Sequence, residues 1–181
     1  MAKRTWEEMK FQRGDPAGTR EFREEVAALE FGRLMRQLRN DAQLSQTGLS
    51  KRLGISQAEV ARIEAGSSMP SVITLLRTAD AFDRHVVVTS FRGSRTNQKW
   101  RLDSPQQASE IVKEIRTGRG MSQNDLAETL GVRQANVARM EDRDSVPRVQ
   151  TLARVARAVG DVLVVGLVHG ERFRDSSKVR L

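Results

Sequence analysis

Residues 44–64 read LSQTGLSKRLGISQAEVARIE, and residues 121–141 read MSQNDLAETLGVRQANVARME. The two stretches align without a gap after a shift of 121 − 44 = 77 positions. The match continues on both sides, so that about 22 of roughly 58 aligned positions are identical. Because a shared composition does not produce such agreement, we interpret the chain as two copies of one short helical module.

Capping residues divide each copy into short helices. In the first copy, Ser45 precedes a helix that ends at Gly54, and Ser56 opens a second helix that ends at Gly66. The second copy repeats the pattern, with helices predicted on either side of Gly131. A third helix is predicted in each copy, near residues 71–82 and 148–159.

Extended segments follow the third helices. The runs HVVVTSF at residues 85–91 and DVLVVGLV at residues 161–168 are rich in β-branched residues and have the length of strands. A polar turn and a short apolar end, WRL or VRL, follow each run, which predicts a β-hairpin. Since an isolated hairpin is marginal in water, these strands should pair. They pair either with each other across a pseudo-twofold axis, as a pseudo-dimer within one chain, or across chains, as a homodimer.

One further helix is expected ahead of each copy. Asp15 and Pro16 predict the start of a long helix, and Ser104, Pro105 and Gln107 predict the start of another. The apolar face of the long helix is expected to contain Phe22, Val26, Leu29, Leu34 and Leu38. The expected domains are an N-terminal extension with the long helix (1–30), a first domain with its strand (31–93), a linker (94–104), a second domain with its strand (105–170) and a tail or second hairpin strand (171–181).

Composition points to a polyanionic partner. The 181 residues include 31 Lys and Arg against 23 Asp and Glu, a net charge of 31 − 23 = +8. With no cysteine and only two histidines far apart, we expect neither a disulfide nor a metal site. The longest apolar run, near residues 162–168, is too short to span a membrane. We therefore expect a cytoplasmic protein with no membrane partner. No phosphate-binding or nucleophile motif occurs, so we expect no cofactor and no enzymatic activity.

The pattern L-S-Q-x-x-L-x-x-x-L-G-x-x-Q-x-x-V-A-R-h-E, in which h is a hydrophobe, resembles the Cro and phage-repressor helix-turn-helix family, also called the XRE family. Both copies carry it, and together they cover about residues 31–92 and 108–170. The resemblance implies a mainly α fold of two tandem lambda-repressor-like domains, each followed by a strand or hairpin. It also implies a sequence-specific regulator of transcription that binds double-stranded DNA. Repression is the simplest mode, because a bound protein blocks polymerase.

A short exposed helix with long polar side chains at its N-terminal end can read base edges in the major groove. The candidate base contacts are Gln57, Ala58, Glu59 and Arg62 in the first copy, and Gln134, Ala135, Asn136 and Arg139 in the second. The alternative is a solvated helix face. Because Glu favours cytosine and Asn favours adenine, Glu59 and Asn136 predict an imperfect inverted repeat or two distinct sub-sites.

Other positions are assigned to phosphates and to structure. By the family resemblance, Gln46 and Gln123 contact phosphates. The same resemblance implies structural ion pairs between Arg39 and Glu64 and between Arg116 and Glu141. Arg133 and Arg143 replace the Ser and Gly of the first copy, so either the helix ends are frayed or the two arginines add phosphate contacts.

The first half carries a second resemblance. WEEMK at residues 6–10, DPAGTRE at 15–21, ALEFGRLMRQLR at 28–39 and TLLRTADAF at 74–82 look like antitoxins of the HigA type, over roughly residues 1–93. This resemblance implies a ribonuclease toxin of the RelE/HigB type as partner, with Trp6, Phe22 and Val26 as candidate contacts. The alternatives are that the long helix completes the first core, that the chain is a phage-type repressor without a toxin, or that it is a protein-interaction adaptor.

Overall fold

Eight helices and four strands form the part of the chain that the computed structural model describes, residues 20–92, 95–169 and 178–180. The first module contains α2 (Arg20–Asp41), α3 (Gln46–Leu53), α4 (Gln57–Glu64) and α5 (Val72–Ala81). The second contains α6 (Gln107–Thr117), α7 (Gln123–Leu130), α8 (Gln134–Met140) and α9 (Val149–Ala158). The strands are β1 (Arg84–Arg92), β2 (Arg95–Leu102), β3 (Val162–His169) and β4 (Lys178–Arg180). The predicted fold class, mainly α with strands after each helical unit, is confirmed.

Capping chemistry sets the helix ends in the first module. The Ser45 hydroxyl accepts a hydrogen bond from Gly48 N, and Gly54 ends α3 in the left-handed conformation, with φ 63°. The Ser56 hydroxyl accepts from Glu59 N at the start of α4. Each bond satisfies a backbone N–H that the helix itself leaves unpaired. In consequence α3 and α4 meet at a tight turn.

The long helix α2 buries Leu38 as expected, but the rest of its buried face differs from the prediction. Ala27, Phe31, Met35 and Leu38 are its buried apolar residues along one face, whereas Val26, Leu29 and Leu34 are only half-buried. The side chain of Phe22 lies outside the described residues. The face is shifted because small residues let α2 approach α4 closely. A Cβ on Gly32 would lie 2.4 Å from the carbonyl oxygen of Ile63, so a larger residue would clash.

The two halves of the chain share one antiparallel sheet with the strand order β2-β1-β3-β4. Strand β1 pairs with β3 in a register in which Val88 lies opposite Val165. These two residues are 165 − 88 = 77 positions apart, the same shift that aligns the two copies, so they are equivalent residues. A pseudo-twofold axis therefore passes through this pair, and within the chain the two copies meet in the way expected of a pseudo-dimer.

The expected linker is largely a strand. Residues 95–102 form β2 and pair with β1 along most of its length. The predicted start of the following helix is also corrected, because α6 begins at Gln107 with Gln106, not Ser104, at the N-cap position. The predicted contact between Gln107 and Ser104 is nevertheless present, because the Gln107 side chain accepts hydrogen bonds from the backbone N–H groups of Asp103 and Ser104. The second module is consequently joined to the sheet by a short connection.

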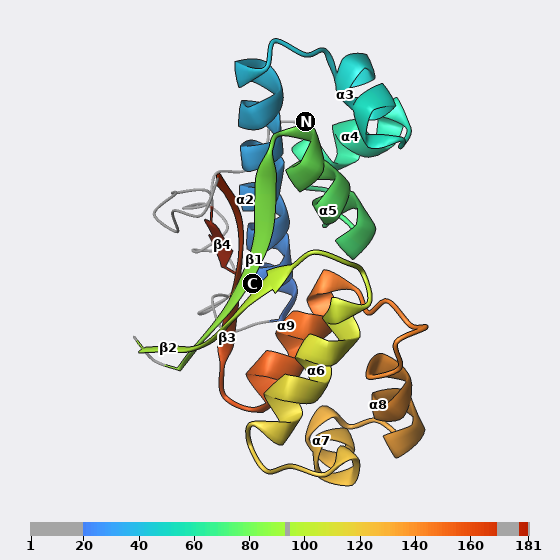
Figure 1. Ribbon diagram of the computed structural model, residues 1–181, viewed down its shortest axis with the longest axis vertical. Helices are drawn as coiled ribbons and strands as arrows, with labels where there is room; N and C mark the ends of the chain where they lie inside the picture. The colour runs from blue at the N-terminus through green and yellow to red at the C-terminus, as the bar shows by residue number, and fades with distance from the viewer. Residues whose placement is uncertain (1–19, 93–94, 170–177, 181) are drawn as a thin grey trace.

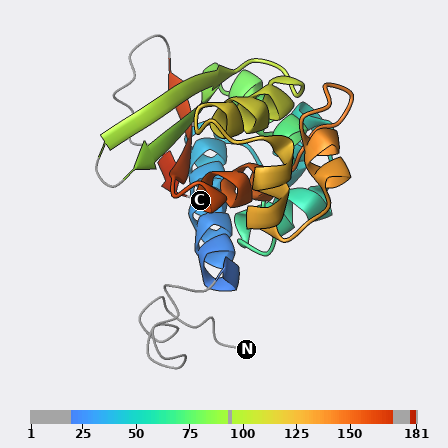
Figure 2. The same ribbon diagram turned by 90° about the horizontal axis from the view of Figure 1, so that it is seen from below.

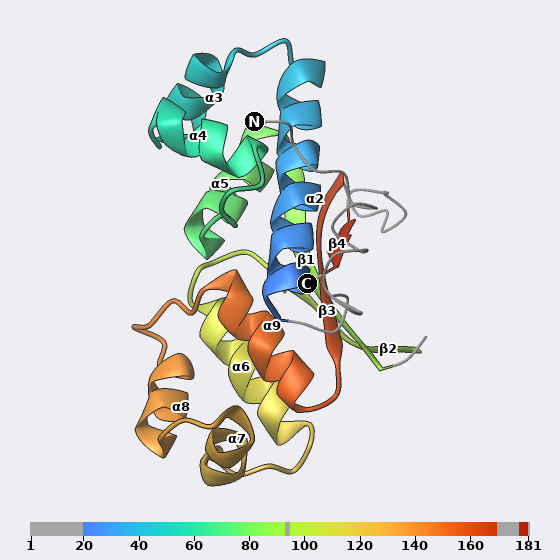
Figure 3. The same cartoon turned by 180° about the vertical axis from the view of Figure 1, so that it is seen from behind.

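The modules lie toward opposite ends of the long axis, with the sheet along one side (Figure 1). Helices α4 and α8 both lie on the side away from the sheet, as the view from below (Figure 2) and the view from behind (Figure 3) also show. The pseudo-twofold relation explains this arrangement, because it carries α4 onto the position of α8. No helix among the described residues is long and apolar enough to cross a membrane.

Candidate nucleic-acid interface

A chain of hydrogen bonds in the first module runs from the buried interior to the exposed start of α4. Arg39 on α2 donates through Nε to Glu64 at 2.6 Å, and the side chain of Glu64 is fully buried. Gln46 Nε2 donates to the other oxygen of Glu64 at 3.0 Å, and Gln57 Nε2 donates to Gln46 Oε1 at 2.9 Å. The ion pair thus orients the glutamine at the start of α3, which in turn orients Gln57.

The second module repeats this chain atom for atom. Arg116 Nε donates to Glu141 at 2.6 Å, Gln123 Nε2 donates to Glu141 at 2.9 Å, and Gln134 Nε2 donates to Gln123 Oε1 at 2.5 Å. Arg39 and Arg116 each also donate to the backbone carbonyl of the residue that precedes the N-cap Ser, Leu44 or Met121. Both modules therefore present a pair of glutamines in the same arrangement.

The buried carboxylates are held ionised by their partners. Burial acts to raise the pKa of Glu64, but hydrogen bonds from Arg39 and Gln46 and the charges of Arg39 and Arg36 outweigh it, and the pKa is lowered. The pKa of Glu141 is lowered for the same reasons, with Arg116 and Gln123 as donors. The hydrogen bonds to these carboxylates raise the pKa of Arg39 and Arg116 in turn. Each pair is thus a fixed, charged anchor.

The side chains proposed to read bases are accessible. Gln57, Ala58 and Arg62 on α4 are exposed, and Glu59 is half-exposed. The equivalent residues of α8 follow the same pattern, with Gln134, Ala135 and Arg139 exposed and Asn136 half-exposed. Gln46 and Gln123 are half-exposed beside them. The Arg and Gln side chains are therefore accessible to a ligand as large as a DNA duplex.

Helix α8 is less firmly set than α4. Its N-cap residue, Arg133, makes no side-chain capping bond, and Val137 is its one buried residue, whereas Val60, Ile63 and Glu64 are all buried on α4. Arg143, which stands where the first copy has Gly66, is largely exposed and contacts Glu110 on α6. Arg133 and Arg143 thus both extend into solvent near α8, and their contact with phosphates stays a prediction.

Some supporting residues were missed in the sequence. Arg77 on α5 donates to the carbonyl oxygens of Leu53 and Gly54 at the end of α3, and its equivalent Arg154 donates to Leu130 at the end of α7. Identity at this position in the two copies is the signal that could have identified them. Of the residues proposed for a protein partner, Trp6 lies outside the described residues and Val26 is half-buried.

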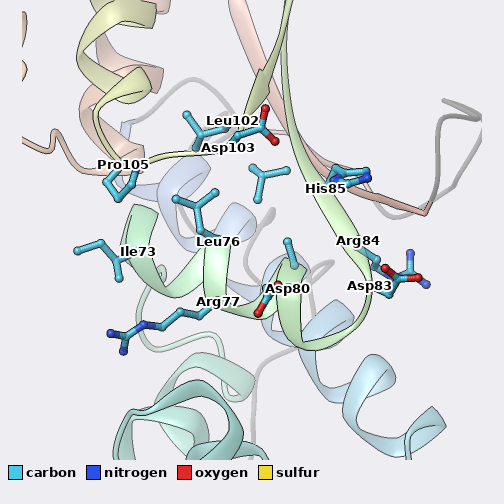
Figure 4. A pocket seen from close by; sticks show the side chains of 12 residues that line it. Ile73, Leu76, Arg77, Asp80, Asp83, Arg84, His85, Leu102, Asp103 and Pro105 are labelled. Carbon is cyan, nitrogen blue, oxygen red and sulfur yellow. The ribbon is translucent and has the colours of Figure 1, made fainter.

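An open pocket of about 480 Å³ lies at the boundary between the two modules (Figure 4). It lies between Ile73 and Leu76 of α5 on one side and Leu102 of β2 and Pro105 of the β2–α6 connection on the other. Among its charged residues, Arg77 donates a hydrogen bond to the end of α3, and Asp103 accepts a hydrogen bond from Arg101. These two charged groups serve the fold, and the pocket is lined by no residue of α4 or α8.

Comparison with known families agrees with this geometry. Residues 30–89 match a family described as helix-turn-helix domain, and residues 112–162 match a second family described as helix-turn-helix. The chain thus contains two tandem helix-turn-helix domains of the XRE type, and it is a DNA-binding regulator of transcription. No curated protein and no solved structure gave a significant match. Neither family match supports the resemblance to antitoxins of the HigA type.

Proposed function

We propose that the chain is a repressor that binds, as a single chain, an operator made of two unequal half-sites. The observation that carries the proposal is the pairing of equivalent residues Val88 and Val165 at the centre of the shared sheet. In many helix-turn-helix proteins two such units come from two chains and bind half-sites about 34–36 Å apart on one face of the duplex. Here one chain supplies both units, with α4 and α8 on the same side.

The half-sites differ because the reading side chains differ. Glu59 of α4 accepts hydrogen bonds and favours cytosine, while Asn136 of α8 both donates and accepts and favours adenine. Gln57 and Gln134, and likewise Arg62 and Arg139, are the same in both units. The operator is an inverted repeat that agrees at most positions and departs from symmetry where these two side chains read it. The chain acts by occupying this site, without a reaction of its own.

Selection of sites from random duplex DNA with the full chain tests the proposal. We expect an imperfect inverted repeat, bound by one chain per duplex as measured by sedimentation of the complex. A perfectly symmetric consensus, two chains per operator, or no enrichment over random sequence would contradict it. A reporter placed behind the selected operator should lose expression when the chain is produced, and an increase would contradict repression.

The antitoxin role stays a prediction that rests on the sequence resemblance. Phe31 and Met35 of α2 are buried in the hydrophobic core, which favours the alternative that this part of the helix completes the first module. The candidate contacts stay Trp6, Phe22 and Val26, and Val26 is half-buried. Co-expression with the product of the neighbouring gene, followed by affinity capture, tests the role. Capture that is lost in Trp6→Ala supports a toxin partner, and the absence of any captured partner contradicts it.

A further inference from the structure

Asp161 is a buried carboxylate at the corner between α9 and β3, and only 2% of the residue is exposed. It accepts hydrogen bonds from Arg92 Nε at 3.1 Å, from Arg119 Nη2 at 2.6 Å and from Asn97 Nδ2 at 2.8 Å. The donors lie on β1, on the turn after α6 and on β2. A single carboxylate at the α9–β3 corner thus joins the β1–β2 hairpin and the turn after α6, which are distant from it and from each other in the sequence.

This cluster crosses the boundary between the two copies. Arg92 and Asn97 belong to the hairpin that follows the first module, whereas Arg119 and Asp161 belong to the second module. Arg92 also donates through Nη2 to the carbonyl oxygen of Val159 at 2.5 Å, at the end of α9. The cluster therefore ties the helical part of the second module to the strands of the first.

The opposite corner is held differently. The residue equivalent to Asp161 is Arg84, since 161 − 77 = 84, and Arg84 donates to the backbone oxygen of Leu167 at 3.2 Å. His169 Nδ1 lies 2.9 Å from the carbonyl oxygen of Asp83. Both corners thus contact the strand of the other copy. In the second module, however, the contact is made by a buried carboxylate that accepts from Arg92 and Asn97 of the first copy, so it includes a pair of opposite charges where the other corner bonds to backbone oxygens.

We propose that the Asp161 cluster, consisting of Asp161, Arg92, Asn97 and Arg119, is a positioning device that holds α8 at a set separation from α4 and so sets the half-site spacing that the chain accepts. The inference rests on the proposed operator of two half-sites. Two linked binding units strengthen each other only when both can engage at once. A rigid link therefore selects one spacing, whereas a loose link tolerates several.

The test compares spacing series for the full chain and for Asp161→Asn. The probes are duplexes that carry the selected operator with its spacer changed by up to three base pairs, and a duplex with a single half-site. For the wild-type chain we expect a loss of at least about tenfold at the wrong spacing, because simultaneous engagement is lost. For Asp161→Asn we expect a loss below about threefold, with binding to the single half-site unchanged.

Two further variants keep the test decisive. Asn97→Ala removes one donor without leaving a buried charge unpaired, so it reports on the cluster even where Asp161→Asn fails to fold. Asp80→Asn removes the same charge as Asp161→Asn from an exposed position on α5, and it should keep the wild-type spacing preference. Circular dichroism checks the fold of each variant.

The outcomes separate the two proposals. Folded Asp161→Asn or Asn97→Ala proteins with the wild-type optimum and the wild-type penalty would overturn the positioning role. If the wild-type chain binds neither the duplex with two half-sites nor the duplex with one, the operator proposal itself is overturned. An equal loss of spacing preference in Asp80→Asn would show that the effect is one of net charge, and would also overturn the positioning role.

Discussion

Glu64 and Glu141 connect the core of each module to the side chains proposed to contact DNA. Each accepts from an arginine and from a glutamine, and the side chains are buried, with 0% and 5% exposed. A buried charge without its partner is costly, whereas a paired one is tolerated. The same carboxylate therefore contributes to stability and to the orientation of Gln57 or Gln134.

The stability of the chain should depend on the ionisation of these carboxylates. A group whose pKa is lower in the folded state contributes stability above its unfolded pKa and loses it as the pH falls through the folded value. Because the pKa of Glu64 is lowered, we expect stability to decrease from near pH 4.3, the ordinary Glu value, downward. Glu64→Gln should cost about 3 kcal/mol at pH 7 and should weaken this pH dependence, as measured by urea unfolding. Glu128→Gln, at an exposed position of α7, is the control and should change neither.

Base preference should follow the residue at position 59. Replacing Glu59 by Asn gives α4 the same side chain that α8 carries at position 136. We expect Glu59→Asn to exchange the preference for cytosine for one for adenine, at about 1–3 kcal/mol for that base pair. Site selection should then return a more symmetric inverted repeat. Asn136→Glu should move the second half-site the other way, and an unchanged consensus in both variants would contradict base contact by these residues.

At the scale of the elements, α8 lacks the N-terminal cap that α4 has. Ser56 accepts a hydrogen bond from Glu59 N, while Arg133 makes no such bond. We expect Arg133→Ser to stabilise the protein by about 1 kcal/mol, because the new hydroxyl can accept from Asn136 N as Ser56 accepts from Glu59 N at the start of α4. Chemical unfolding measures the gain, and amide hydrogen exchange should slow within α8.

The matched change in the first module is Ser56→Ala, which should cost about 1 kcal/mol by removing the cap of α4. A gain from Arg133→Ser without slower exchange in α8 would mean that the stabilisation comes from elsewhere, for example from the lower positive charge. Arg133→Ala separates the two, since it removes the same charge and adds no hydroxyl.

The helices that position the site could be predicted from local signals. Ser45, Gly54 and Ser56 fix where α3 and α4 begin and end, and such caps act within one turn of the chain. The buried face of α2 and the extent of β2 could not be predicted in this way. The first depends on the close approach of α4 at Gly32. The second depends on pairing with β1. The polar residues of β2 have little strand propensity of their own, and they form a strand because β1 is beside them.

At the scale of the whole molecule, the duplication is visible in the sequence but the meeting of the two copies is not. Strand register is set by partners far away in the chain, so the sequence alone leaves open whether the strands pair within one chain or across chains. In the structure Val88 lies opposite Val165 of the same chain. The role of Asp161, whose equivalent is Arg84, could not be predicted from the repeat, because only the folded chain brings Arg92, Asn97 and Arg119 to it.

The salt dependence of DNA binding belongs to the whole molecule, because it counts phosphate contacts over both modules. If Arg133 and Arg143 each contact a phosphate, replacing both by Ala should reduce the slope of log affinity against log salt by about 0.9 for each, or roughly 1.8 in total. Fluorescence anisotropy over a salt series measures the slope. Arg101→Ala is the control, because Arg101 belongs to β2 and pairs with Asp103, and it is part of neither α4 nor α8. A slope that falls equally in Arg101→Ala would place the DNA on the sheet side, and affinity indifferent to salt in the wild-type chain would favour an interaction adaptor.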